Sequence, residues 1–227
     1  MSEEQLILDL PHRAALGAED FLVSDCNLGA VRLIDSWPDW QDRIQLLIGP
    51  PASGKTHLVR VWQAMSGARI LAAESLDMQT LDAMGGGDAA SVEDIDRVSC
   101  DEKALFHLLN AARERGVFLL LTSREAPSRF DCELPDLRSR LNGLPAIRIG
   151  SPDEALLKTV MLKQFEDRQL SVEPKVLDAI ALRIDRSLAA AAQAVEALDR
   201  AALASGQKIT RQLVTKVLGA GAPNEGG

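Results

Sequence analysis

The sequence predicts an α/β fold in which a mostly parallel sheet is flanked by helices and followed by a small helical domain. Three observations predict it. Short apolar runs alternate with helical periodicity between residues 44 and 150, which is typical of a parallel sheet covered on both faces. A glycine-rich loop joins the first apolar run to a helix. After residue 151 only helical periodicity remains.

The elements of the first part are expected in strict alternation. Strands are predicted at 44–49, 68–73, 89–95, 118–123 and 146–150, and helices at 57–65, 75–84 and 103–116. Ser99 or Asp101 can cap the last of these helices, and Gly116 stands where it would end. Its apolar side chains share one face: Leu105, Leu108, Leu109 and Ala112.

The second part is expected to hold four helices, at 152–169, 174–185, 187–206 and 210–219. Ser151 and Glu154 have the spacing of a capping box, with Pro152 at the first helical position. The predicted domain organisation is a flexible peptide at 1–12, an α/β core at 13–151, a helical domain at 152–219 and a disordered tail at 220–227.

Composition excludes several classes of protein. With 227 residues, 46% of them hydrophobic, the chain can bury a substantial core. It has neither a secretory leader nor an apolar run long enough to span a membrane, so a cytoplasmic protein without membrane attachment is expected. Its three cysteines lack metal or disulfide spacing. A net charge of −8 and the absence of tyrosine disfavour direct, sequence-specific DNA binding.

The strongest motif is GPPASGKT at 49–56, which satisfies G-x-x-x-x-G-K-[ST] between a strand and a helix. In such a loop Gly54 lets backbone N–H groups face a phosphate, Lys55 reaches the β- and γ-phosphates, and Thr56 ligates magnesium. An accidental glycine turn is the alternative. His57 either lines the loop or is a satisfied helix histidine. The other predicted nucleotide-binding residues of the loop are Gly49, Pro51, Ala52 and Ser53.

A phosphate loop needs an acidic partner at a neighbouring strand end. Glu93 and Asp94 are the candidates, Glu93 for magnesium and Asp94 as a catalytic residue that orients water. A solvated acidic loop would look the same. Thr122 and Ser123 end another strand, where side chains can sense the γ-phosphate, although this is also an ordinary strand end.

These motifs, together with LPDLRSRLNGL at 134–144 and RIDRSL at 183–188, resemble AAA+ ATPases of the DnaA branch over nearly the whole chain. The resemblance implies that Arg140 is an arginine finger acting in trans and that Arg186 is the second sensor in a helical lid. Without it, each would be an exposed helix arginine. The stretch 19–31 resembles the adenine-side segment of that family, which implies contacts from Phe21, Leu22, Val23 and Asn27.

The opening QLILDL resembles the peptide by which bacterial proteins dock on the replicative sliding clamp, the β subunit of DNA polymerase III. Gln5 would hydrogen-bond at the rim of the groove. Three leucines would enter it in an extended conformation: Leu6, Leu8 and Leu10. A first edge strand is the alternative.

The chain lacks the basic helix-turn-helix domain of the initiator itself. The resemblance therefore implies a DnaA-related regulator that binds ADP or ATP with Mg²⁺, docks on the clamp and offers Arg140 to nucleotide bound by DnaA. Glu93 and Arg124 stand where the family has aspartate, which implies weak intrinsic hydrolysis. Two alternatives remain. One is a self-sufficient ATPase that forms a homodimer or larger oligomer, remodels DNA or a replication protein and uses Asp94 to orient water. The other is a clamp-tethered adaptor that makes no catalytic contribution.

Overall fold

The computed structural model describes residues 21–76, 83–97 and 101–219. The chain divides between Gly150 and Ser151 into two compact units, an α/β unit and a helical unit. Three sequence-based predictions lie outside or largely outside the described residues: the clamp-binding peptide, the C-terminal tail and the helix at 75–84.

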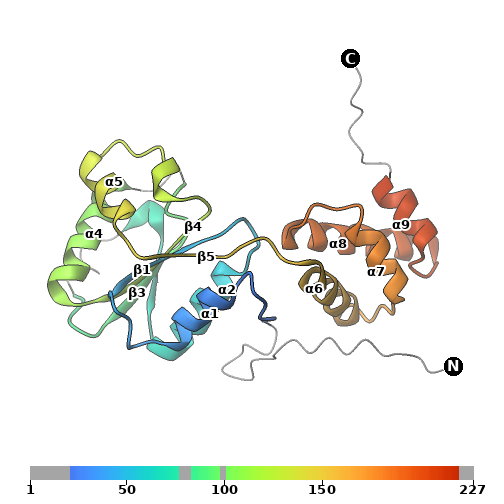
Figure 1. Cartoon of the computed structure of the whole chain (residues 1–227), viewed down its shortest axis with the longest axis horizontal. Helices are drawn as coiled ribbons and strands as arrows, with labels where there is room; N and C mark the ends of the chain where they lie inside the picture. Colours follow the sequence, from blue (N-terminus) through green and yellow to red (C-terminus); the bar gives the residue numbers. More distant parts are fainter. Residues whose placement is uncertain (1–20, 77–82, 98–100, 220–227) are drawn as a thin grey trace, which may run out of the picture. The chain divides into compact units, whose positions relative to one another are not determined.

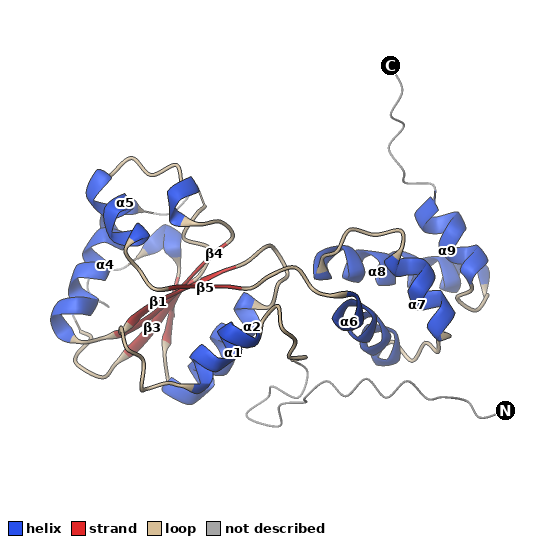
Figure 2. Cartoon of the chain, in the orientation of Figure 1, coloured by secondary structure: helices blue, strands red, loops and turns tan. Residues whose placement is uncertain are grey.

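The α/β unit is built on one parallel sheet (Figure 2). Its strands are β1 (Ile44–Ile48), β2 (Arg69–Leu71), β3 (Ala89–Val92), β4 (Phe118–Ser123) and β5 (Ala146–Arg148). The strand order is β2-β3-β4-β1-β5, so β4 lies between β3 and β1. Because carboxyl ends of parallel strands meet at one edge, this order brings the phosphate loop, the acidic pair and the end of β4 together.

Helices cover both faces of this sheet (Figure 1). One face carries α1 (Leu28–Asp35) and α2 (Lys55–Ser66), and the other carries α4 (Glu102–Arg115) and α5 (Pro135–Asn142). Alternate strand residues enter the two cores, because successive side chains of a strand point to opposite faces. In β1, for example, Leu46 packs toward α4 and α5 while Leu47 packs toward α1 and α2. Two short 3₁₀ turns complete the unit, η1 (Ala73–Ser75) and η2 (Pro127–Arg129).

Helix α4 shows how the sequence sets the ends of an element. The side chain of Asp101 accepts hydrogen bonds from the N–H groups of Lys103 (3.0 Å) and Ala104 (3.1 Å), so Asp101 is the N-cap. Gly116 ends the helix with a φ of 73°, a left-handed conformation that glycine adopts without strain. The predicted end and the apolar face of this helix are confirmed.

The helical unit contains α6 (Glu154–Asp167), α7 (Pro174–Ala181), α8 (Leu188–Ser205) and α9 (Arg211–Leu218). Its own core is centred on fully buried side chains such as Phe165 and Met161. The ammonium group of Lys158 lies 2.6 Å from the carboxylates of both Asp178 and Glu154, which joins α6 to α7. These hydrogen bonds, that of Asp178 first, raise the pKa of Lys158.

The predicted capping box at the start of α6 is wrong. The helix begins at Glu154, and Asp153 is its N-cap, with a side-chain oxygen 2.7 Å from the backbone nitrogen of Leu156. A carboxylate is a stronger acceptor than the hydroxyl of Ser151 and also complements the helix dipole. Pro152 therefore precedes the helix. The next helix, predicted to reach residue 185, ends at Ala181.

Candidate functional site

The phosphate loop connects β1 to α2, and its two glycines are required by its shape. Gly54 has a φ of 94°, and a Cβ atom there would lie 2.6 Å from Cε2 of Phe21. At Gly49 a Cβ atom would lie 2.6 Å from Oγ of Ser53. Ala52 also has positive φ, at 60°. This compact turn leads into the N-terminus of α2, where no N-cap side chain accepts from the first turn. Such N–H groups suit an anion.

Lys55 is held inside this loop. Its side chain donates to the carbonyl oxygens of Gly49 (2.6 Å) and Pro50 (3.1 Å), and only 6% of the residue is exposed. Burial lowers its pKa, and the nearby carboxylates of Asp94 and Asp96 partly oppose this effect. The ammonium group of Lys55 is therefore held by two neutral carbonyl oxygens. A charged phosphate oxygen would be a stronger acceptor for it.

The structure brings together the two residues predicted to hold magnesium. Thr56 lies in the first turn of α2 and Glu93 directly follows β3, and the hydroxyl of Thr56 donates to the carboxylate of Glu93 at 2.5 Å. Mg²⁺ takes oxygen ligands in octahedral geometry, commonly one or two carboxylates with phosphate oxygens and water. A paired hydroxyl and carboxylate beside a phosphate loop fits that ion.

The hydroxyls at the end of β4 are fully buried and serve backbone groups. Oγ1 of Thr122 accepts the N–H of Asp94 at 2.9 Å, and Oγ of Ser123 donates to the carbonyl of Glu125 at 2.7 Å. Thr122 thus fixes the position of the acidic loop. Sensing of the γ-phosphate by these two residues stays a prediction.

Arg124 is a residue of this site to which sequence reasoning assigned no role. Its Nη2 lies 3.1 Å from Oδ2 of Asp94, and its backbone N–H donates to Oδ2 of Asp96 at 2.8 Å. The available signal was the arginine that follows Thr122 and Ser123, a position where the resembled family has aspartate. Asp94 is therefore near the phosphate loop, as predicted, but is paired with a cation.

The predicted adenine-side residues form a support against the loop. The ring of Phe21 stacks on His57, with 4.9 Å between centroids and 13° between planes. Asn27 is buried, and its amide donates to the carbonyl of Leu22 and accepts from the N–H of Ser24, both at 2.9 Å. Leu22 and Val23 are buried too. Asn27 therefore shapes this segment, and Phe21 with His57 is its part nearest the loop.

The predicted arginine finger lies on α5, and the predicted second sensor belongs to the helical unit. Arg140 is on α5, where its guanidinium carbon is 4.7 Å from the ring centre of Phe106 on α4. Arg186 lies in the helical unit, just before the N-cap of α8. Its side chain is 69% exposed, and its Nη2 lies 4.0 Å from Oε2 of Glu154.

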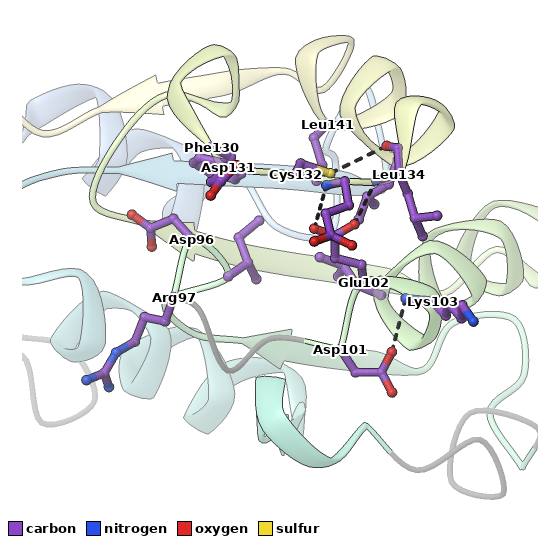
Figure 3. A pocket seen from close by; sticks show the side chains of 14 residues that line it. Asp96, Arg97, Asp101, Glu102, Lys103, Phe130, Asp131, Cys132, Leu134 and Leu141 are labelled. Atoms are coloured by element: carbon purple, nitrogen blue, oxygen red, sulfur yellow. Dashed lines mark hydrogen bonds between the residues drawn. The ribbon is translucent and has the colours of Figure 1, made fainter.

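Two cavities lie along the acidic side of the α/β unit. A cavity of about 220 Å³ borders Glu93 and Asp94. A second, of about 450 Å³, is lined by the loop after β3, the start of α4, residues 130–134 and α5 (Figure 3). No residue predicted to bind nucleotide lines this larger cavity. Within it, the carboxylate of Glu102 accepts the N–H groups of Glu133 (2.9 Å) and Leu134 (2.8 Å).

These contacts predict a pH-dependent contribution to stability. Burial raises the pKa of Glu102, but the two backbone hydrogen bonds, together with the Cys132 thiol and the charge of Arg138, outweigh burial and hold it below its ordinary value of 4.5. Ionised Glu102 thus stabilises the fold above about pH 4.5, and this contribution is lost as pH falls through the lower folded-state pKa. Glu102→Gln is expected to lower the free energy of unfolding by about 1 kcal/mol at pH 7.

Urea unfolding followed by tryptophan fluorescence measures this effect, since all three tryptophans (Trp37, Trp40 and Trp62) belong to the α/β unit. The difference between wild type and Glu102→Gln should shrink as pH is lowered below about 4. Glu114→Gln, an exposed change on the same helix, is the control. A difference that is equal at pH 7 and at the lowest pH would contradict the assignment.

Comparison with known proteins places the fold. No family model matches the chain. An uncharacterized protein of Haemophilus influenzae is 26% identical over 183 residues, covering 75% of this chain and 79% of that protein. Domain III of the Thermotoga maritima replication initiation protein DnaA superposes with a TM-score of 0.70 at 18% identity, covering 89% of this chain and 95% of that domain.

Two further structures agree with this placement. A single-residue variant of Thermotoga maritima RuvB has a TM-score of 0.67 at 18% identity, over 86% of this chain and 68% of that one. The initiator DnaA bound to AMPPCP and single-stranded DNA has a TM-score of 0.65 at 15% identity, over 83% and 67%. The predicted fold class, a mostly parallel sheet flanked by helices and followed by a small helical domain, is confirmed, and these DnaA and RuvB structures share it.

Proposed function

We propose that this chain is a nucleotide-binding regulator of replication initiation that resembles Hda, the DnaA-related protein that inactivates the initiator. The observation that carries this proposal is the assembled loop, with Lys55 beside Thr56 and Glu93, in a fold similar to DnaA domain III. One of the similar structures, the initiator DnaA, holds the nucleotide analogue AMPPCP. Nucleotide binding by this chain is the simplest use of such a site.

In the proposed complex, ADP or ATP binds along the phosphate loop. Lys55 exchanges its carbonyl partners for β- and γ-phosphate oxygens, and the first turn of α2 directs N–H groups at them. Thr56 and Glu93 hold Mg²⁺, which neutralises phosphate charge when bound. Phe21 and His57 flank the base, and Arg186 approaches the phosphates from the lid.

The regulatory activity is proposed to act in trans. Residues 5 to 10 dock on the sliding clamp loaded on DNA, and the AAA+ core then meets ATP-bound DnaA. Arg140 is offered to the nucleotide of DnaA, where its planar and permanently charged guanidinium neutralises charge that develops during hydrolysis. The nucleotide of the chain itself acts mainly as a structural ligand in this scheme.

The test is hydrolysis of ATP bound to purified DnaA, measured with and without clamp-loaded DNA. Wild type is expected to accelerate ADP formation only when loaded clamp is present. A chain lacking residues 1 to 10 should lose at least about tenfold of this acceleration, because recruitment raises the local concentration of the core. Glu4→Ala, which lies just outside the docking motif, is the control and should behave as wild type.

The alternative of a self-sufficient ATPase gives a different result in the same assay. If the nucleotide of DnaA is untouched while the chain consumes ATP by itself, the regulator proposal is wrong. If deletion of residues 1 to 10 leaves the acceleration intact, clamp docking through this peptide is wrong, although action on DnaA would stand.

A further inference from the structure

The ion pair between Arg124 and Asp94 is the feature of the site that the proposed function leaves unused. Nη2 of Arg124 and Oδ2 of Asp94 are 3.1 Å apart, with side chains 42% and 29% exposed. Arg124 directly follows β4, and Asp94 lies in the loop after β3. β4 and β3 are neighbouring strands, so the pair spans two adjacent strand ends.

Backbone contacts hold both partners of this pair in place. Oδ2 of Asp96 accepts the N–H groups of Arg124 (2.8 Å) and Glu125 (3.1 Å). Oγ1 of Thr122 accepts the N–H of Asp94, whose φ of 52° is unusual for a residue other than glycine. An exposed ion pair is normally weakened by the entropy of two free side chains. Here the hydrogen bonds of Thr122 and Asp96 fix both backbones, so the two side chains start within reach of each other.

The pair also lies beside the phosphate loop. β4 is hydrogen-bonded to β1 on its other side, and the N–H of Gly49 donates to the carbonyl of Ser123 at 3.1 Å. Both charges are close enough to Lys55 to shift its pKa: Asp94 raises it and Arg124 lowers it. The carboxylate of Asp94 therefore lies near Lys55 and is already paired with Arg124.

We propose that Arg124 is a positioning residue that suppresses hydrolysis of the nucleotide bound by this chain, by holding Asp94 away from the attacking water. This inference rests on the proposed nucleotide site. In hydrolysis, water oxygen forms a bond to the γ-phosphorus, the bond from that phosphorus to the β–γ bridging oxygen breaks, and a water proton passes to an acceptor. The Asp94 oxygen that Arg124 holds at 3.1 Å is occupied and is not free to accept that proton.

The experiment measures steady-state ATP hydrolysis by the full chain in the absence of DnaA. Arg124→Ala is expected to raise kcat about fivefold or more while leaving KM within about twofold. Arg124→Lys should keep turnover low, since an ammonium group can still pair with Asp94. In the double variant Arg124→Ala with Asp94→Asn the gain should disappear. Arg129→Ala removes a 75%-exposed arginine from the following turn and should change nothing.

Fluorescent analogues of ADP and of non-hydrolysable ATP, titrated in parallel, separate the two proposals. If wild type and Arg124→Ala bind both equally but turnover does not rise, the suppression by Arg124 is wrong and the nucleotide site stands. If Arg124→Ala weakens binding of ATP but not of ADP without faster turnover, Arg124 is a phosphate contact, and the inference is again wrong. If wild type binds no nucleotide, the proposed function fails and this inference with it.

Discussion

Arg140→Ala is expected to reduce clamp-dependent hydrolysis of DnaA-bound ATP by about 10³-fold or more, the range found when an arginine finger is removed. The fold itself should tolerate the change. The contact described for this side chain is with the ring of Phe106 at 4.7 Å, and a cation–π contact of this kind contributes only about 0.5–1 kcal/mol at a partly exposed position.

Single-turnover hydrolysis of labelled ATP on DnaA, at saturating loaded clamp, measures the effect. Binding of ADP to the variant itself should equal that of wild type, since Arg140 contacts a helix outside the phosphate loop. Arg113→Ala removes an exposed arginine from α4, the helix that carries Phe106, and is the matched control. Retention of more than half of the stimulation by Arg140→Ala would exclude the finger role.

Lys55→Ala should weaken binding of ADP to the chain by about 100-fold, which corresponds to about 3 kcal/mol. The reason is that Lys55 is the buried ammonium group of the loop, and its present partners are two neutral carbonyls, those of Gly49 and Pro50. A bound phosphate would gain a charged partner in a partly desolvated position, and alanine supplies none.

Anisotropy of a fluorescent ADP analogue measures this change in affinity, and tryptophan fluorescence in urea confirms that the variant is folded. Lys103→Ala, at an exposed position in the first turn of α4, has the same change of charge and should bind ADP as wild type does. An affinity of Lys55→Ala within threefold of wild type would mean that the loop is not the nucleotide site.

Much of the fold could be predicted because its strands and helices differ in period. The three- and four-residue spacing of the apolar side chains in α4 matches a helix, and the short apolar run of β1, ended by glycine, favours a buried strand by its length. The exact start of a helix was harder to predict where two residues compete to be its N-cap. Ser151 and Asp153 both precede α6 and both are good N-cap residues, and the choice between them depends on which acceptor reaches the backbone nitrogen of Leu156.

Some contacts of the candidate site could also be predicted from the sequence, and others could not. The pairing of Thr56 with Glu93 could be expected, because the phosphate loop motif fixes one residue, and parallel strands bring the carboxyl end that carries the other to the same edge of the sheet. The pairing of Arg124 with Asp94 could not be expected, because two residues thirty positions apart met through the register of β3 and β4. The hydrogen bonds of Asn27 to backbone groups of Leu22 and Ser24 could not be expected either, and its contact with a base stays a prediction.

The packing of Phe21 against Gly54 and His57 limits the distance between the phosphate loop and the proposed docking peptide. It anchors the described chain at the phosphate loop itself, so the proposed docking peptide at 5–10 is joined to that loop by residues 11–20 alone. The eleven Cα–Cα steps from Leu10 to Phe21 span at most about 40 Å, whatever conformation the chain takes. If the peptide occupies the clamp groove, the nucleotide of this chain must lie within that radius of the clamp, and DnaA has to approach along the DNA close to the ring.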